Sequence, residues 1–263
     1  MLIKCYFDGG NRADSTQYDV VTLAAVSGMP SQWRHFNADW KIILKKHGAD
    51  FLHTTDAVSL KKPFDAGSGW SSDRVDSFIW ECVATIGRHI AIPVHNSAVP
   101  REGLYPFTAT VVLKDFVCAR GANPEVPKDA TEVLATQALH ACIEWAESRG
   151  AHFMDLFYDR SEPYRGHAVD RQRNPKAVMQ LPSLTRITIH PDIDASCTPA
   201  LQMADLFAWN VTHKEAAKRP WHHALLDLPR GDEWIGYDDL IKPIPGVPDL
   251  VKSWKLPKRK PTR

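Results

Sequence analysis

Residues 199–211 (PALQMADLFAWNV) constrain the fold more than any other part of the chain. They predict a helix, with Thr198 as its N-cap and Pro199 as its first residue. Apolar side chains leave no polar face one turn wide, so this helix must be buried nearly all round. Asp205 lies in its middle, where an ionised carboxylate is costly unless something offsets its charge. Asp205 is therefore either a hydrogen-bonded structural residue or a ligand of a cation.

Two other aspartates end apolar strands. Asp8 follows LIKCYF and Asp159 follows HFMDLFY. The ligand-facing edge of an α/β sheet lies at the carboxyl ends of its strands. Three converging carboxylates would need a cation, which predicts a divalent metal and cleavage of phosphate esters. The alternative for Asp8 is a turn residue before Gly9-Gly10.

Asp155 competes with Asp159, because strand alternation places both on one face. At about 3.3 Å per residue they are roughly 13 Å apart. Paired catalytic metals lie only about 4 Å apart, so the two aspartates should not share a compact site. Asp159, at the carboxyl end of the strand, is the better candidate.

His53 and Asp56, in FLHTTD, form a second polar pair. They would supply a nitrogen and an oxygen to a metal, or a base and its orienting acid. The alternative is an ordinary N-cap for the turn that follows. For HPDIDAS, which carries His190, Asp192 and Asp194, a polar loop is the simpler interpretation, and we expect His222-His223 at the surface.

The rest of the chain predicts one α/β domain. We expect strands at 2–8, 20–27, 90–99, 152–158 and 184–190, and helices at 31–46, from 71 or 72 to about 88, 105–119 and 131–148. Beyond about residue 218 the chain is rich in Trp, Pro and Gly, which suggests an irregular extension over the surface.

The composition limits which partners and which cellular compartment we expect for the protein. The net charge of +1 gives no bulk attraction to nucleic acid or membrane, and only the tail KSWKLPKRKPTR is strongly basic. Five widely spaced cysteines without CxxC argue against a disulfide framework or a zinc site. We recognise neither a signal peptide nor a membrane span, so we expect a reduced, cytoplasmic protein with no membrane partner. No GxxxxGK[ST], GxGxxG, HExxH or GxSxG motif is present.

These pieces together resemble a known family. Their order is a strand ending YFD, the strand VVTLAAVS, the helix SQWRHFNADWKIIL, then FLHTTD, a Gly-Trp element and QMADLFAW. This order is similar to that of the domain-of-unknown-function 3800 family, related to ribonuclease H, over about residues 3–215. The resemblance implies a ribonuclease-H-like mixed sheet flanked by helices, formed by residues 1–218 with a helical insertion at about 30–88. Residues 219–263 would be an extension with the basic tail.

The resemblance also implies a site. Asp8 would bridge two Mg²⁺ or Mn²⁺ ions, Asp159 and Asp205 would each hold one, and His53 and Asp56 would complete the site. Family members typically carry Glu-Ser-Gly after the first Asp, whereas this chain has Gly9-Gly10-Asn11. Either Asp56 or Glu162 substitutes for the missing carboxylate, or metal binding is weakened, or catalysis is lost.

Three functions follow as hypotheses. The first is a metal-dependent nuclease or phosphodiesterase that acts on RNA or DNA. The second is a catalytically inactive member that binds nucleic acid or protein. The third is another metal hydrolase, with His53 and Asp56 bound directly to a transition metal.

Overall fold

The structure is a computed structural model that describes residues 1–10, 19–90, 103–160, 163–172, 184–213 and 219–241. Within these residues the strands are β1 (Leu2–Gly9), β2 (Val20–Gly28), β3 (Tyr105–Val112), β4 (Phe153–Tyr158), β5 (Arg186–Ile189) and β6 (Gly231–Ile235). The helices there are α1 (Pro30–His47), α2 (Thr54–Val58), α3 (Ser72–His89), α4 (Leu113–Ala122), α5 (Ala130–Ser148), α6 (Tyr164–Gln172), α7 (Pro199–Thr212), α8 (Pro220–Leu226) and α9 (Tyr237–Ile241), with short 3-10 turns η1 (Ala66–Ser68) and η2 (Ala195–Cys197). The predicted α/β class is confirmed.

The strands of the described residues form one mixed sheet in the order β5-β4-β1-β2-β3-β6. β1 pairs antiparallel with β2, and β2 antiparallel with β3. β1 pairs parallel with β4, β4 with β5, and β3 with β6. The first strand is therefore central, and its carboxyl end lies beside that of β4.

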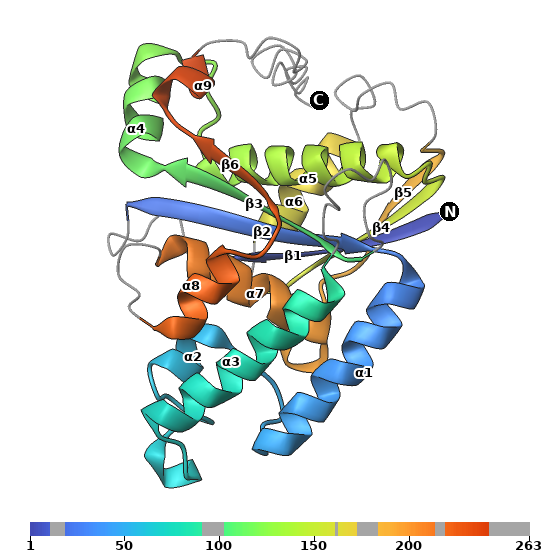
Figure 1. The fold of residues 1–263 in the computed structure, drawn as a ribbon. Helices are drawn as coiled ribbons and strands as arrows, with labels where there is room; N and C mark the ends of the chain where they lie inside the picture. The colour runs from blue at the N-terminus through green and yellow to red at the C-terminus, as the bar shows by residue number, and fades with distance from the viewer. Residues whose placement is uncertain (11–18, 91–102, 161–162, 173–183, 214–218, 242–263) are drawn as a thin grey trace, which may run out of the picture.

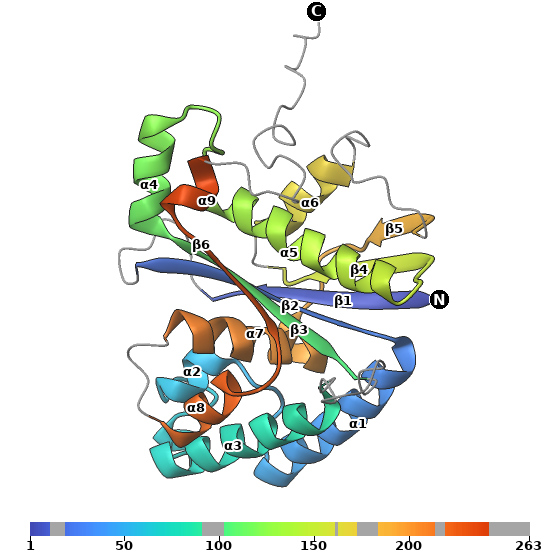
Figure 2. The same ribbon diagram turned by 45° about the horizontal axis from the view of Figure 1, so that its top comes forward.

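Helices cover both faces of the sheet, as Figures 1 and 2 show: α4, α5, α6 and α9 lie on one side, and α1, α2, α3, α7 and α8 on the other. Strand alternation divides β1 between these layers. Ile3, Cys5 and Phe7 pack in the core that contains α5, whereas Tyr6 packs in the core that contains α7. Asp8 shares the face of Tyr6 and so points to the α7 side.

Helix α7 is the centre of the second core. Every one of its residues is buried, as its apolar circumference predicted. Thr198 occupies the N-cap and Pro199 the first turn, although the Thr198 side chain makes no capping hydrogen bond. The helix packs on β1 and β2, so its polar side chains lie inside the protein and are shielded from bulk water.

Two predictions about secondary structure were wrong. The helix expected at 105–119 is strand β3 followed by α4. β3 alternates Phe107, Ala109 and Val111 with Thr108 and Thr110, but α4 begins directly after Val112, so one uninterrupted segment contains a strand and a helix. The chain after residue 218 is not irregular in its described part, because α8 precedes β6, which extends the sheet beside β3.

Other predicted elements agree with the structure. Helices α1, α2 and α3 lie between β2 and β3, where the helical insertion at about 30–88 was expected. In α3 the Ser71 hydroxyl caps the helix by accepting from the Arg74 N–H, whereas α1 begins at Pro30, one residue before the expected start. The strand expected at 90–99 lies outside the described residues except for Ile90, which bridges to Leu104.

Candidate functional site: carboxylates at the β1–β4 edge

Asp8 and Asp159 are neighbours across two parallel strands. Phe7 and Tyr158 are register partners, and the Asp159 N–H donates to the Phe7 carbonyl over 3.3 Å. Each aspartate is the next residue of its strand, and paired strands lie about 4.8 Å apart. Both side chains therefore fall on the face that α7 covers.

Asp205 lies on α7 with 7% of its surface exposed. Its Oδ2 accepts from the backbone N–H of Thr54 at 2.7 Å and from the Thr54 hydroxyl at 2.8 Å. Burial raises the pKa of Asp205, the charge of His53 and the two Thr54 bonds lower it, and the Asp159 carboxylate raises it further. The net pKa of Asp205 is above the ordinary value for an aspartate, and the nearby carboxylate of Asp159 contributes to this rise.

The carboxyl end of β1 runs against the same helix. The Gly10 N–H donates to the Thr22 carbonyl at 2.9 Å, and a Cβ at Gly10 would lie 2.5 Å from the Ala208 carbonyl oxygen and in contact with Thr212. Ala208 and Thr212 lie one and two turns beyond Asp205 on the same side of α7. The absence of a side chain at Gly10 thus allows the strand end that carries Asp8 to approach the Asp205 side of the helix.

His53 and Asp56 form the predicted pair. His53 precedes α2, and its Nδ1 is 2.7 Å from Oδ2 of Asp56. Although burial lowers the pKa of His53, the carboxylates of Asp205, Asp56 and Asp159 raise it more, and its net pKa is above the ordinary value. His53 is therefore close enough to Asp205 and Asp159 for the charges of both carboxylates to raise its pKa.

Gln202 holds this arrangement together, although sequence reasoning assigned it no role beyond the motif. Its Oε1 accepts from Trp40 Nε1 at 2.8 Å and from the Leu52 N–H at 3.0 Å. Its Nε2 donates to the carbonyls of Ala195 at 2.9 Å and Ser196 at 3.3 Å. The Ala195 N–H in turn donates to Asp159 Oδ1 at 3.1 Å. One buried amide thus joins the segment before His53 to the loop that contacts Asp159.

Thr54 was also missed as a site residue. It lies inside FLHTTD, where a threonine reads equally well as a helix cap, and its partner Asp205 is 151 positions away. Gln202 and Asp205, one turn apart on α7, bind the backbone N–H groups of Leu52 and Thr54, which flank His53. We call these two contacts the Gln202–Asp205 clamp. Two sequence features indicate it: the spacing Gln-x-x-Asp on a buried helix, and an extended segment before a short helix.

The rejected candidates have structural partners. Asp155 Oδ1 lies 3.3 Å from His190 Nε2, and Asp192 lies 3.5 Å from Arg165. Asp194 caps η2 by accepting from the Ser196 N–H. The prediction that His222-His223 is at the surface was wrong for His222, which is fully buried beneath Trp209 and Trp221.

The donor set contains hard oxygen ligands, which suit Mg²⁺ or Mn²⁺. The part of the chain that the structure describes contains no group of three or more Asp, Glu, His or Cys side chains already gathered at metal-binding distance. Glu162 and the basic tail lie outside the described residues. Asp8, Asp159 and Asp205 are therefore not already gathered around one metal position in this structure.

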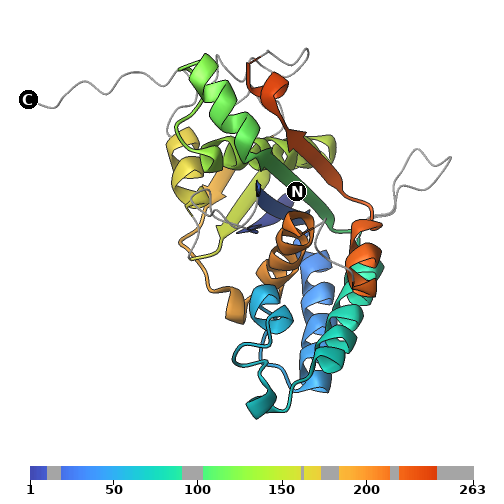
Figure 3. The same cartoon turned by 90° about the vertical axis from the view of Figure 1, so that its left-hand side faces the viewer.

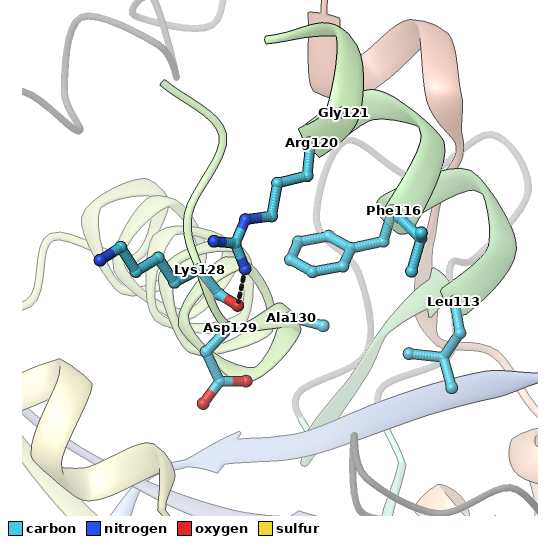
Figure 4. A pocket seen from close by; sticks show the side chains of 8 residues that line it. Leu113, Phe116, Arg120, Gly121, Lys128, Asp129 and Ala130 are labelled. Atoms are coloured by element: carbon cyan, nitrogen blue, oxygen red, sulfur yellow. Dashed lines mark hydrogen bonds between the residues drawn. The ribbon is translucent and has the colours of Figure 1, made fainter. Parts of the chain in front are cut away.

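A separate cavity lies on the other layer of the molecule, between α4 and the start of α5 (Figure 4). Its volume is about 630 Å³, and Arg120 closes one side by donating to the Lys128 carbonyl at 2.8 Å. None of the predicted site residues lines it. The lining residues are Leu113, Phe116, Val117, Arg120, Gly121, Lys128, Asp129 and Ala130.

All five cysteines are free thiols. Among the described residues, no helix combines the length and the apolar character that crossing a membrane requires. Compared with protein-family models and with curated proteins, the chain matches none, and the family resemblance drawn from its motifs stays a prediction.

Proposed function

We propose that this protein is a metal-dependent nuclease or phosphodiesterase that acts on nucleic acid, with Asp8, Asp159 and Asp205 as ligands of Mg²⁺ or Mn²⁺. The observation that carries the proposal is the common placement of the three aspartates. Two lie at the carboxyl ends of adjacent parallel strands, and the third is a buried acid on α7, which packs on β1 and β2. This is the arrangement that the ribonuclease-H-like resemblance implies, and we extend the proposal to that fold.

The environment of Asp205 supports a cation. Its carboxylate is buried, and in the described part of the chain its hydrogen bonds come from Thr54 alone, both to Oδ2. These bonds and the charge of His53 do not offset the burial of the carboxylate, because the net pKa of Asp205 stays above its ordinary value. Bound metal ions would supply that compensation, activate a water molecule and stabilise the charge of an in-line displacement.

The His53–Asp56 pair would handle protons beside the carboxylates. With Nδ1 held by Asp56, the Nε2 of His53 is the nitrogen that can accept or release a proton. Asp56 would fix the tautomer and the orientation of the ring. His53 would then act as the acid or base of the reaction, and Asp56 as its positioning residue.

The second candidate function is a catalytically inactive member of the same fold that binds nucleic acid or protein. The sequence Gly9-Gly10 supports it, because no carboxylate follows Asp8 where the family commonly has one. The spread of the three carboxylates supports it as well, since no described group is already gathered for a metal.

Cleavage assays separate the two candidates. Purified protein is incubated with labelled RNA, DNA and RNA–DNA hybrid in Mg²⁺ or Mn²⁺. The nuclease proposal predicts cleavage by the wild type and its loss in Asp8→Asn and Asp205→Asn. Wild-type protein that binds an oligonucleotide but cuts none with either metal would favour the inactive member. Zinc retained through purification would instead favour the metal hydrolase with His53 and Asp56 as ligands.

A further inference from the structure

The face of the sheet that carries Asp159 has an exposed part at its β4–β5 edge. Along β4 the side chains of Phe153, Asp155 and Phe157 alternate onto this face, whereas Met154 packs in the core on the other face. Phe153 is 44% exposed. In Figure 3, α1, α3 and α8 lie on the β6 side of the molecule and β4 and β5 at the opposite side. At this end of the sheet the Phe153 side chain is open to solvent, whereas Phe157 is partly buried against the core that contains α7.

Each of the two aromatic rings that β4 places on this face has a cation near it. Arg186 is the register partner of Phe153, and its guanidinium lies 5.6 Å from the centre of that ring. Lys4 extends from β1 on the other side, and its Nζ lies 5.7 Å from the centre of the Phe157 ring. In the described part of the chain neither cation forms an ion pair with a carboxylate, although Asp155 is the register partner of Lys4 on the same face. Arg186 has no such acidic neighbour among its register partners.

Three rings form a row directly before the candidate site. Tyr6 stacks on Phe157 at 4.8 Å, and Phe157 stacks on His190 at 4.4 Å with an angle of 9°. The next row toward the carboxyl ends contains Asp8 and Asp159. His190 ends the row at the β5 edge, and its Nε2 lies 3.3 Å from Oδ1 of Asp155 on the same face. The rings thus lead from the open face to the carboxylates.

From these contacts we infer that this face, defined by Lys4, Phe153, Phe157, Arg186 and His190, binds a single-stranded segment of nucleic acid that runs along β4 toward Asp159. The inference rests on the proposed function and names the form of its substrate. Bases would stack on Phe153 and on His190, the end ring of the Tyr6–Phe157–His190 stack, while Lys4 and Arg186 contact phosphates. From Phe153 to Asp159 the surface is about 20 Å long, at 3.3 Å per residue.

A single strand fits this surface better than a duplex. Stacking on protein rings needs bases that are free of their own pairing, and open sheet faces with two or three aromatic rings bind RNA in this way. The paired bases of a duplex present only phosphates to such a surface, and two cations alone are a weak contact. Rings with adjacent cations therefore predict selectivity for unpaired strands.

Binding is measured without divalent metal, so that no cleavage intervenes. The full chain is titrated into a fluorescently labelled 12-mer of dT and into a 12-base-pair duplex, and anisotropy is recorded in EDTA. We expect tighter binding of the single strand and a loss of at least about 5-fold in Phe153→Ala, the lower end for one stacked base. Arg186→Gln should weaken binding and lower the slope of log K against log salt by about 1.

Matched controls come from other surfaces. Trp80 on α3 is 48% exposed, and Trp80→Ala removes a comparable exposed ring without touching the sheet face. Lys41→Gln removes one positive charge from the exposed side of α1. Both variants should bind the 12-mer as the wild type does, and circular dichroism of all four variants checks that they are folded.

The results separate this inference from the proposed function. Equal affinity of Phe153→Ala and wild type for the 12-mer, or no binding by the wild type, overturns the inference even if metal-dependent cleavage occurs. A preference for the duplex overturns it as well. Selective loss of single-strand binding in Phe153→Ala and Arg186→Gln supports it, even if no substrate is cut.

Discussion

Asp205 accepts both the backbone N–H and the hydroxyl of Thr54, at 2.7 and 2.8 Å, across 151 positions of sequence. These two bonds attach the segment that carries His53 to the buried helix α7. They also direct Oδ2 of Asp205 toward the protein and leave Oδ1 for another partner. The relationship between Asp205 and Thr54 therefore connects the stability of the fold to the geometry of the candidate site.

The first prediction concerns the Thr54 hydroxyl. Thr54→Val keeps the shape and the backbone bond but removes one donor to a buried carboxylate, so it should lower the free energy of unfolding by about 1–3 kcal/mol. Chemical denaturation measures the change. Thr54→Ser keeps the hydroxyl and is the matched control, for which we expect a smaller loss. Equal losses in the two variants would mean that the hydroxyl bond contributes nothing.

A second prediction follows from the raised pKa of Asp205. Protonated Asp205 contributes stability that is fully present below the unfolded pKa and is lost as pH rises through the raised folded value. At higher pH without metal this stability is lost, so Asp205→Asn, which cannot ionise, should raise the Tm at pH 7 while abolishing any response to Mn²⁺. The gain should shrink as pH falls toward 4. A lower Tm for Asp205→Asn at pH 7 contradicts this reasoning.

Gln202 gives a third prediction. Gln202→Ala leaves Trp40 Nε1, the Leu52 N–H and the Ala195 carbonyl without their partner in a buried region. Each orphaned group costs about 1–3 kcal/mol, so we expect a loss of at least about 3 kcal/mol. Gln202→Glu keeps the acceptor for Trp40 and Leu52 but loses the amide donor.

Hydrogen exchange separates the contacts of the Gln202 oxygen from those of its nitrogen. In Gln202→Glu the Leu52 amide should stay protected, while the loop around Ala195 exchanges faster than in the wild type. Unchanged exchange at Ala195 would show that the amide does not hold this loop beside Asp159.

Gly10 supports a fourth prediction, because a methyl group there would collide with the Ala208 carbonyl and with Thr212. Gly10→Ala should push the end of β1 away from α7 and cost about 1–3 kcal/mol through overpacking. Thermal denaturation measures the effect. Gly166 on α6 is the control, since a Cβ there has open space and Gly166→Ala should be neutral or slightly stabilising. Equal stability of Gly10→Ala and wild type would place the strand end farther from α7.

Local patterns predicted the elements whose surroundings differ between their faces. Helix α3 has a Ser71 cap and an apolar side, and β4 alternates between Met154 in the core and Asp155 outside it. Strand β3 was not separated from the helix after it, because α4 begins at Leu113 directly after β3 and no turn signal marks the boundary. The pairing of β6 with β3 joins Phe107 to Gly231, a contact that no local pattern encodes.

The contacts of the candidate site also fall into two groups, those that the sequence predicted and those that it did not. The placement of Asp8 and Asp159 at the carboxyl ends of their strands followed from local patterns, whereas the family resemblance alone implied that these strands are neighbours. The short-range bond between His53 and Asp56 followed from their spacing. The contacts of Asp205 with Thr54 and of Gln202 with Leu52 depend on how α7 lies in the core, which required the structure.

The central claim is that Asp8, Asp159 and Asp205 together hold a divalent cation, and calorimetric titration of the metal-free protein with Mn²⁺ tests it most directly. Metal that binds only the folded state stabilises it by about 2.7 kcal/mol at one hundred times its Kd, so a rise in Tm provides an independent readout. We predict saturable binding by the wild type and its loss in Asp8→Asn, Asp159→Asn and Asp205→Asn, with Asp155→Asn still binding. Wild-type protein that takes up no Mn²⁺ or Mg²⁺, or three variants that bind as the wild type does, would contradict the account.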